Sequence, residues 1–187
     1  MPAAVVARRV LVSGSIASLA STLMASCLGW RHSGAASAAT NSTSQWVWGE
    51  TARRRYAPSA RYTALGYAIH HASSIFWAGF FEYATRREHR APRIAAAAAA
   101  TAATAYVVDY HLVPRRLTPG FDSHLPAGAM FATYAAFGAG LAAGGIAVRH
   151  LAGRKARQHA GTTTPRGTPG PPAARTAARP ARASPAR

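Results

Sequence analysis

Four long apolar stretches constrain this chain more than any other feature of its sequence. They cover residues 10–29, 62–81, 94–113 and 125–148. Each reaches about 20 residues, the length that a helix needs to cross the hydrocarbon core of a bilayer. A soluble bundle would show charged residues recurring at the helical period, and these stretches contain almost none. We therefore predict an all-α membrane protein with four transmembrane helices in one bundle, formed by residues 1–148.

The overall composition agrees with this prediction. Only 14% of the residues are charged, against about a quarter in typical soluble domains. The first stretch is rich in serine and the third in alanine, so these two are the weaker candidates for spanning helices. The single cysteine, Cys27, excludes an intramolecular disulfide.

The N-terminus allows a second interpretation. Arg8 and Arg9 precede an apolar run that ends in "MASC" at residues 24–27, which loosely resembles a lipoprotein cleavage box. In that case residues 1–26 would be removed. The run is long for a signal sequence, however, and Met24 is atypical at the first position of such a box, so we expect a retained helix.

The distribution of Lys and Arg predicts the orientation, because these residues accumulate on the cytoplasmic side. With the N-terminus in the cytoplasm, 15 of the 22 Lys and Arg residues lie inside and seven lie outside. Most of this difference comes from the C-terminal segment. We therefore expect both the N-terminus and the C-terminus to be cytoplasmic.

Residues 149–187 form an Arg- and Pro-rich segment with nine Lys or Arg residues and no acid. It lacks apolar periodicity, so we predict a disordered cytoplasmic tail. Its charge would attract anionic lipid headgroups. Nucleic acid is a less suitable partner, because the segment has no aromatic residues to stack on bases.

Small residues recur every four positions on two of the predicted helices, as on helices that pack closely in lipid. They are Gly14, Ser18 and Thr22 on the first helix and Ala136, Gly140 and Gly144 on the fourth. Contacts within the chain and self-association explain this pattern equally well. The pattern therefore leaves open whether the chain binds a membrane-protein partner or forms a homo-oligomer.

Ionisable residues inside the predicted spans are the candidate site, since such groups are costly in lipid and often functional. Helix geometry places His70 about 12 Å and Asp109 about 6 Å below the outer surface. The candidate metal-binding cluster in the outer half consists of His70, His71, Asp109, His111 and His124. Adjacent histidines point about 100° apart, so His70 and His71 cannot share one contact, and we expect one of them to meet Asp109 or a backbone carbonyl.

Three roles are open for this cluster. The favoured role is structural and needs no cofactor: a neutral histidine is satisfied by a neighbouring hydroxyl from Ser73, Ser74, Thr133 or Tyr134. The alternatives are a metal or haem site and a path for ions or protons. No catalytic motif is present, so we do not predict an enzyme, and Glu82 and Glu88 are expected to pair with Arg86 and Arg87 at the helix end.

The stretches "NSTSQWVWGE", "GYAIHHASSIFW" and "DYHLVPRRLTPGF" resemble small four-span inner-membrane proteins of Gram-negative bacteria. The resemblance covers roughly residues 10–148 and leaves out the tail. It implies a place in the bacterial inner membrane and carries over no catalytic or binding residue. The sequence thus predicts a multi-pass membrane protein that is a structural or interaction component, with a metal-binding, haem-binding or ion-translocating protein as the alternative.

Overall fold

The computed structural model describes residues 3–162, which form helices and connecting turns and contain no strand. Four helices are long and three are short. The long helices are α1 (Ala3–Ser33), α5 (Leu65–Ala84), α6 (Ala91–Val107) and α7 (Ala127–Thr162), and the short ones are α2 (Ala38–Thr43), α3 (Gln45–Trp48) and α4 (Glu50–Arg53). Single helical turns η1 (Ala60–Ala64), η2 (Val108–Leu112), η3 (Arg115–Leu117) and η4 (Phe121–Ser123) complete the connections.

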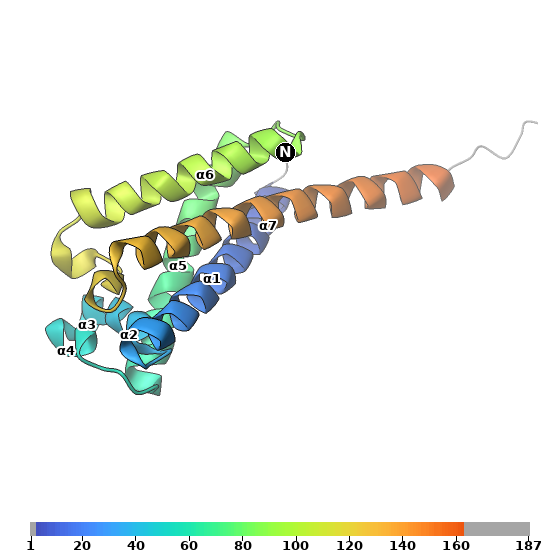
Figure 1. The fold of residues 1–187 in the computed structure, drawn as a ribbon. Helices are drawn as coiled ribbons and strands as arrows, with labels where there is room; N and C mark the ends of the chain where they lie inside the picture. The colour runs from blue at the N-terminus through green and yellow to red at the C-terminus, as the bar shows by residue number, and fades with distance from the viewer. Residues whose placement is uncertain (1–2, 163–187) are drawn as a thin grey trace, which may run out of the picture.

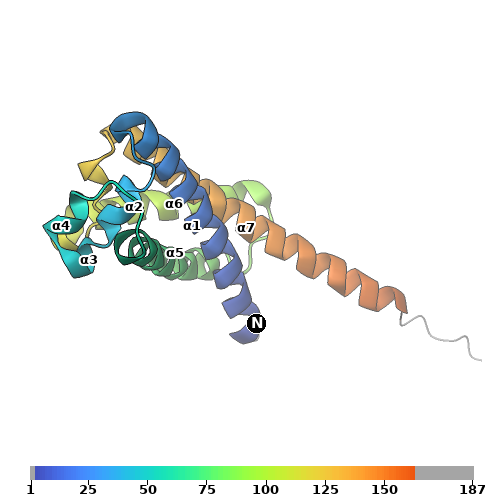
Figure 2. The same cartoon turned by 90° about the horizontal axis from the view of Figure 1, so that it is seen from below.

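The four long helices pack into one bundle. α1 packs against both α5 and α7, and α6 packs against α7 (Figures 1 and 2). The short helices α2, α3 and α4 gather at the end of the bundle where α1 ends and α7 begins (Figure 1). We call these three helices together with residues 115–123 the cap, because they cover that end.

Small residues allow the close approach of the long helices. A Cβ atom added at Gly140 would lie 2.5 Å from the Cα of Ala17, and one added at Gly144 would lie 2.6 Å from the Cα of Ser13. Gly14 faces α5 in the same way, with Ile75 Cα 2.9 Å from an added Cβ. The prediction of helix-contact faces at these glycines is confirmed, and the contacts are within the chain.

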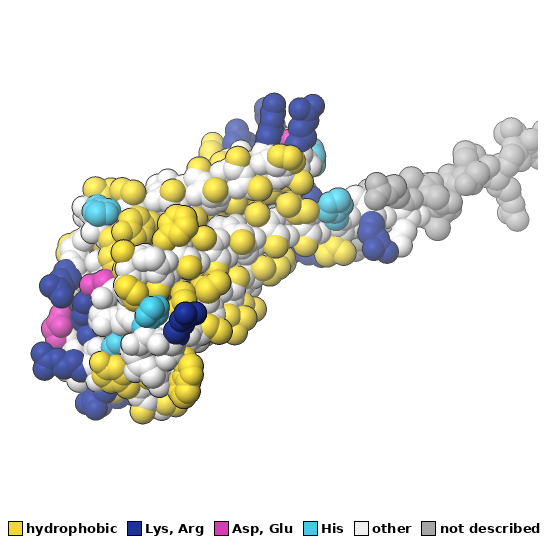
Figure 3. All heavy atoms as spheres, in the orientation of Figure 1, with side chains coloured by type: hydrophobic (Ala, Val, Ile, Leu, Met, Phe, Trp, Pro, Cys, Tyr) yellow, Lys and Arg dark blue, Asp and Glu magenta, His cyan; other side chains and the backbone are white. Residues whose placement is uncertain are grey.

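Three of the described helical segments are long and apolar enough to cross a membrane: Ala3–Ser33, Ala91–Leu112 and Ala127–Arg154. Large apolar side chains such as Leu23, Phe76 and Phe131 are exposed on the bundle surface. Figure 3 shows basic side chains mainly at the ends of the bundle, with apolar side chains between them. These features are compatible with a multi-pass membrane protein.

The sequence ranked the four candidate spans differently from the structure. It made the first and third stretches the weaker candidates, yet the helices that contain them are among the three segments. The second stretch, α5, is the helix that falls outside them. His70, His71 and Glu82 account for this, because they lower the hydropathy of a helix of only 20 residues.

The C-terminal boundary also differs from the prediction of a disordered tail from residue 149. α7 continues without a break to Thr162. Residues 149–162 contain no proline and several good helix formers, so nothing in the sequence stops the helix there. The remainder of the predicted tail, residues 163–187, lies outside the described residues.

Candidate functional site

A cavity of about 50 Å³, lined by apolar side chains and several polar ones, lies in the bundle directly beneath the cap. A buried water molecule needs roughly 10–15 Å³ of such space, so the cavity has room for a few waters. Its polar lining comes from all four long helical segments, namely Ser21, His70, Ser74, Asp109, Thr133 and Tyr134. Two of the predicted site residues, His70 and Asp109, therefore face one shared space.

His70 is held by α1 and by its own helix. Its Nε2 atom lies 2.9 Å from the hydroxyl of Ser21, and the hydroxyl of Ser74 donates to its backbone carbonyl at 2.8 Å. Its ring also lies 5.8 Å from that of Phe121 in the cap. A hydroxyl thus satisfies the histidine, as the structural interpretation predicts, but the partner of the ring is Ser21 of α1.

Asp109 is held by α7 rather than by the histidine. The hydroxyl of Tyr134 donates to Asp109 Oδ2 at 2.6 Å. Asp109 lies in η2, the π-helical turn that continues α6 and shifts its side chain relative to the α-helical register. No ion pair joins His70 and Asp109 within residues 3–162, so the expected direct contact between them is not present.

The other three candidate residues lie apart from this cavity. His71 stacks near Tyr67 with ring centroids 5.7 Å apart, and its Nδ1 atom is buried without a hydrogen-bond partner. His111 lies 5.7 Å from Tyr106. His124 lies 5.0 Å from Tyr56 and lines a different surface pocket. In the described part of the chain, no three His, Cys, Asp or Glu side chains are grouped closely enough to hold a metal ion.

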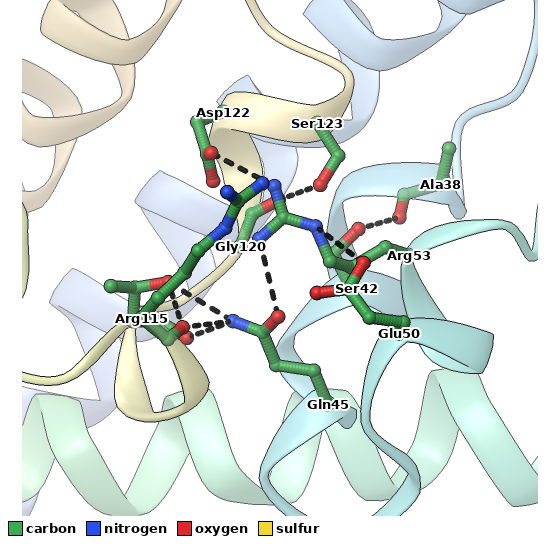
Figure 4. Close-up of polar contacts among 10 residues, drawn as sticks. Ala38, Ser42, Gln45, Glu50, Arg53, Arg115, Gly120, Asp122 and Ser123 are labelled. Atoms are coloured by element: carbon green, nitrogen blue, oxygen red, sulfur yellow. Dashed lines mark hydrogen bonds and ion pairs between the residues drawn. The ribbon is translucent and has the colours of Figure 1, made fainter.

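The cap is held together by a hydrogen-bond network, drawn in Figure 4. The guanidinium of Arg53 donates to Asp122 Oδ2 at 2.9 Å and to Gln45 Oε1 at 3.2 Å. Gln45 in turn donates to the carbonyl of Thr118 at 2.6 Å. The network ties α3 and α4 to the connection between α6 and α7. Arg53 is therefore a structural cation of the cap.

Asn41 anchors the cap to the start of α5. Its side-chain nitrogen donates to the carbonyls of Arg55 at 2.9 Å and Ala57 at 3.1 Å, and its oxygen accepts from Thr63 at 2.6 Å. Asn41 is completely buried. The signal that sequence reasoning missed is the uncharged polar run at residues 40–45, which is fully buried in the structure.

A second buried polar group lies at the opposite end of the bundle. Arg149 Nη2 of α7 lies 3.0 Å from Glu82 Oε2 of α5. The same guanidinium donates to the carbonyls of Gly145 and Thr85 at 2.7 and 2.9 Å. The expected pairing of Glu82 with Arg86 or Arg87 is therefore wrong: Glu82 points into the bundle, where it forms an ion pair with Arg149 of α7. Glu88 pairs with Arg93 at 3.5 Å.

An apolar layer separates the cavity from this ion pair. Ala17, Ala78, Phe81 and Leu141 are fully buried and lie on α1, α5 and α7 between the two polar groups. Along α5, His70 and Glu82 are about 18 Å apart, since a helix rises 1.5 Å per residue. The core beneath the cavity is therefore packed.

The geometry thus offers a small cavity with several polar side chains under a hydrogen-bonded cap, and a buried ion pair at the far end. The chain was also compared with known proteins. No protein-family model, no curated protein and no solved structure matches it.

Proposed function

We propose that the protein is a four-span protein of the bacterial inner membrane, with both termini in the cytoplasm, that acts as a structural or interaction component. The observation that carries this proposal is the continuity of α7 from the cap end to Thr162. One helix joins the apolar bundle to a basic segment that extends beyond the other helices (Figures 1 and 2). The bundle then serves as an anchor for a cytoplasmic arm, which we define as residues 151–162.

The proposal of a fourth span rests on α5. Its 20 residues correspond to about 30 Å of helix, which matches the hydrocarbon core. α5 packs against α1, and its aromatic side chains Phe76 and Phe80 are 60% and 55% exposed. Its histidines face the bundle, where Ser21 and the cavity accommodate His70. Neighbouring helices therefore offset the low hydropathy of α5.

The arm supports an interaction role through its charge. Residues 149–162 contain Arg149, Arg154, Lys155 and Arg157 and no acid. Arg149 is used inside the bundle, whereas Arg154 is exposed. A basic helix that emerges at the cytoplasmic surface attracts anionic headgroups or an acidic face of a membrane-protein partner. The positive-inside distribution of Arg also favours this end as the cytoplasmic one.

Site-specific photo-crosslinking in native membranes tests the interaction role. A crosslinking residue at position 154 in the arm should give a protein adduct of one defined mass, because Arg154 is exposed. The matched position is the exposed Phe131, which faces lipid in this proposal and should give no such adduct. Reporter fusions near Arg90 and after Arg157 should report cytoplasm, and a fusion near Trp48 should report periplasm. The absence of a protein adduct at position 154, or a periplasmic C-terminus, would contradict the proposal.

A second candidate function, a site for a small polar ligand or a proton, rests on the cavity that His70 and Asp109 share. Translocation across the whole bundle is disfavoured by the packed layer of Ala17, Ala78, Phe81 and Leu141. Haem is far larger than a cavity of about 50 Å³. Purification in mild detergent, followed by mass spectrometry of the small molecules released on denaturation, separates the two candidates. A stoichiometric polar molecule that His70→Asn removes would favour the second.

A further inference from the structure

Arg9 is a buried cation without a partner in the described residues. Its relative exposure is 9%, and its Nη1 atom is inaccessible and makes no hydrogen bond. None of the ion pairs of residues 3–162 includes Arg9. An ionised group that is buried and unpaired is strongly destabilising, so such a group needs a counter-charge.

The neighbours of Arg9 do not supply a full counter-charge. Arg9 interacts electrostatically with Arg149, which repels it, and with Glu82, which attracts it. The carboxylate of Glu82 is already paired with Arg149 at 3.0 Å. Arg149 is itself saturated by the carbonyls of Gly145, Thr85 and Glu88. Two guanidinium groups thus share one carboxylate, and one positive charge remains at this end of the bundle.

The position of Arg9 indicates which anion is available. Arg9 lies two turns into α1, at the end of the bundle opposite the cap, next to the end of α5 and the exit of α7. The α5–α6 connection adds Arg86, Arg87 and Arg90 to this end. In a bilayer this level corresponds to the headgroups, where phosphate is the abundant anion and an accessible donor of an arginine side chain can bind it.

We propose that Arg9 binds the phosphate group of an anionic phospholipid at this end of the bundle. The lipid supplies the missing counter-charge. It also joins the start of α1, and the part of α7 that leaves the bundle, to the membrane surface. This proposal rests on the membrane placement proposed above, but it requires neither the cytoplasmic orientation nor the arm. Its failure is therefore distinguishable from that of the proposed function.

The test compares wild type, Arg9→Gln and Arg8→Gln in a neutral detergent, with and without phosphatidylglycerol in the micelles. Arg8 is the matched control because it is adjacent, carries the same charge and is exposed. Phosphatidylglycerol should raise the melting temperature of wild type and Arg8→Gln by about 2–4 °C and leave Arg9→Gln unchanged. Native mass spectrometry should show phosphatidylglycerol retained by the first two proteins and lost from the third.

Without lipid, Arg9→Gln should be at least as stable as wild type, because the change removes an uncompensated charge. Three outcomes would overturn the proposal. A clear loss of stability there, with an unchanged lipid response, would mean that Arg9 pairs with Glu82. An equal lipid response in all three proteins would remove Arg9 from any lipid site. An equal stabilisation of wild type by millimolar inorganic phosphate, without lipid, would assign the site to a free anion.

Discussion

Arg149 and Glu82 form an ion pair inside the bundle, with 3.0 Å between Nη2 and Oε2 and side-chain exposures of only 6% and 1%. Arg149 also donates to the hydroxyl of Thr85 at 2.8 Å. One guanidinium therefore joins the exit of α7 to the last turn of α5. Because both charges are removed from water, each depends on the other.

Replacing Arg149 with Gln should cost about 3–5 kcal/mol of unfolding free energy, since it removes the ion-pair partner of the buried Glu82. The matched control is Arg154→Gln, an exposed position about one turn further along α7, which should change stability by less than about 0.5 kcal/mol. Chemical unfolding in detergent micelles measures both. Equal effects of the two substitutions would mean that the pair contributes nothing specific.

Double-mutant cycles at the cavity should reveal two separate pairs. Ser21 with His70, and Asp109 with Tyr134, should each show a coupling of about 0.6–2 kcal/mol, the range for hydrogen bonds between membrane helices. Suitable substitutions are Ser21→Ala, His70→Asn, Asp109→Asn and Tyr134→Phe.

The cross pair of His70 and Asp109 is the control for these cycles. The two residues face the same cavity but form no ion pair, so their coupling should be much smaller than that of either hydrogen-bonded pair. A cross coupling as large as the direct ones would show that ordered waters join the two groups into one unit.

The sequence predicted the helical class and much of the close packing, because both follow from patterns within one helix. The apolar stretches gave the four long helices, and the spacing of Gly140 and Gly144 correctly located the face that meets α1. Depth along a helix is equally local: it predicted His70 and Asp109 in the same outer half, and both residues line one cavity.

The partners of polar groups could not be predicted, because they depend on which helices are neighbours and how each is rotated. His70 meets Ser21 of α1, a helix that the prediction did not consider as its neighbour. Arg149 was assigned to a tail because basic residues follow it, yet it turns inward toward Glu82. Nothing in the sequence near Arg53 indicates that its side chain is buried in the cap and pairs with Asp122, which is far along the chain.

Adding a methyl group at the α1–α7 contact should separate the two helices. Gly140→Ala and Gly144→Ala place Cβ atoms against the backbone of Ala17 and Ser13, so each should cost about 1–3 kcal/mol. Gly153→Ala is the control, because nothing lies within 4 Å of a Cβ there, and helix propensity predicts a small gain. Unfolding experiments in detergent check the ranking. A loss at Gly153 as large as that at Gly140 would contradict it.

The stability of the cap should fall in mildly acidic solution because of His124. Burial holds the pKa of His124 below its usual 6.5, the charge of Arg53 acts in the same direction, and a backbone hydrogen bond and the charge of Asp122 oppose them. The unfolded chain therefore binds a proton at a higher pH than the folded chain, so the stabilisation is complete above about pH 6.5 and is lost as the pH falls below it.

Unfolding measured between pH 5 and pH 8 should show this decline in wild type and a smaller one in His124→Asn. His89 is the control, as an exposed histidine at the opposite end of the bundle, and His89→Asn should keep the full decline. If His124→Asn kept it as well, the acid sensitivity would come from another group.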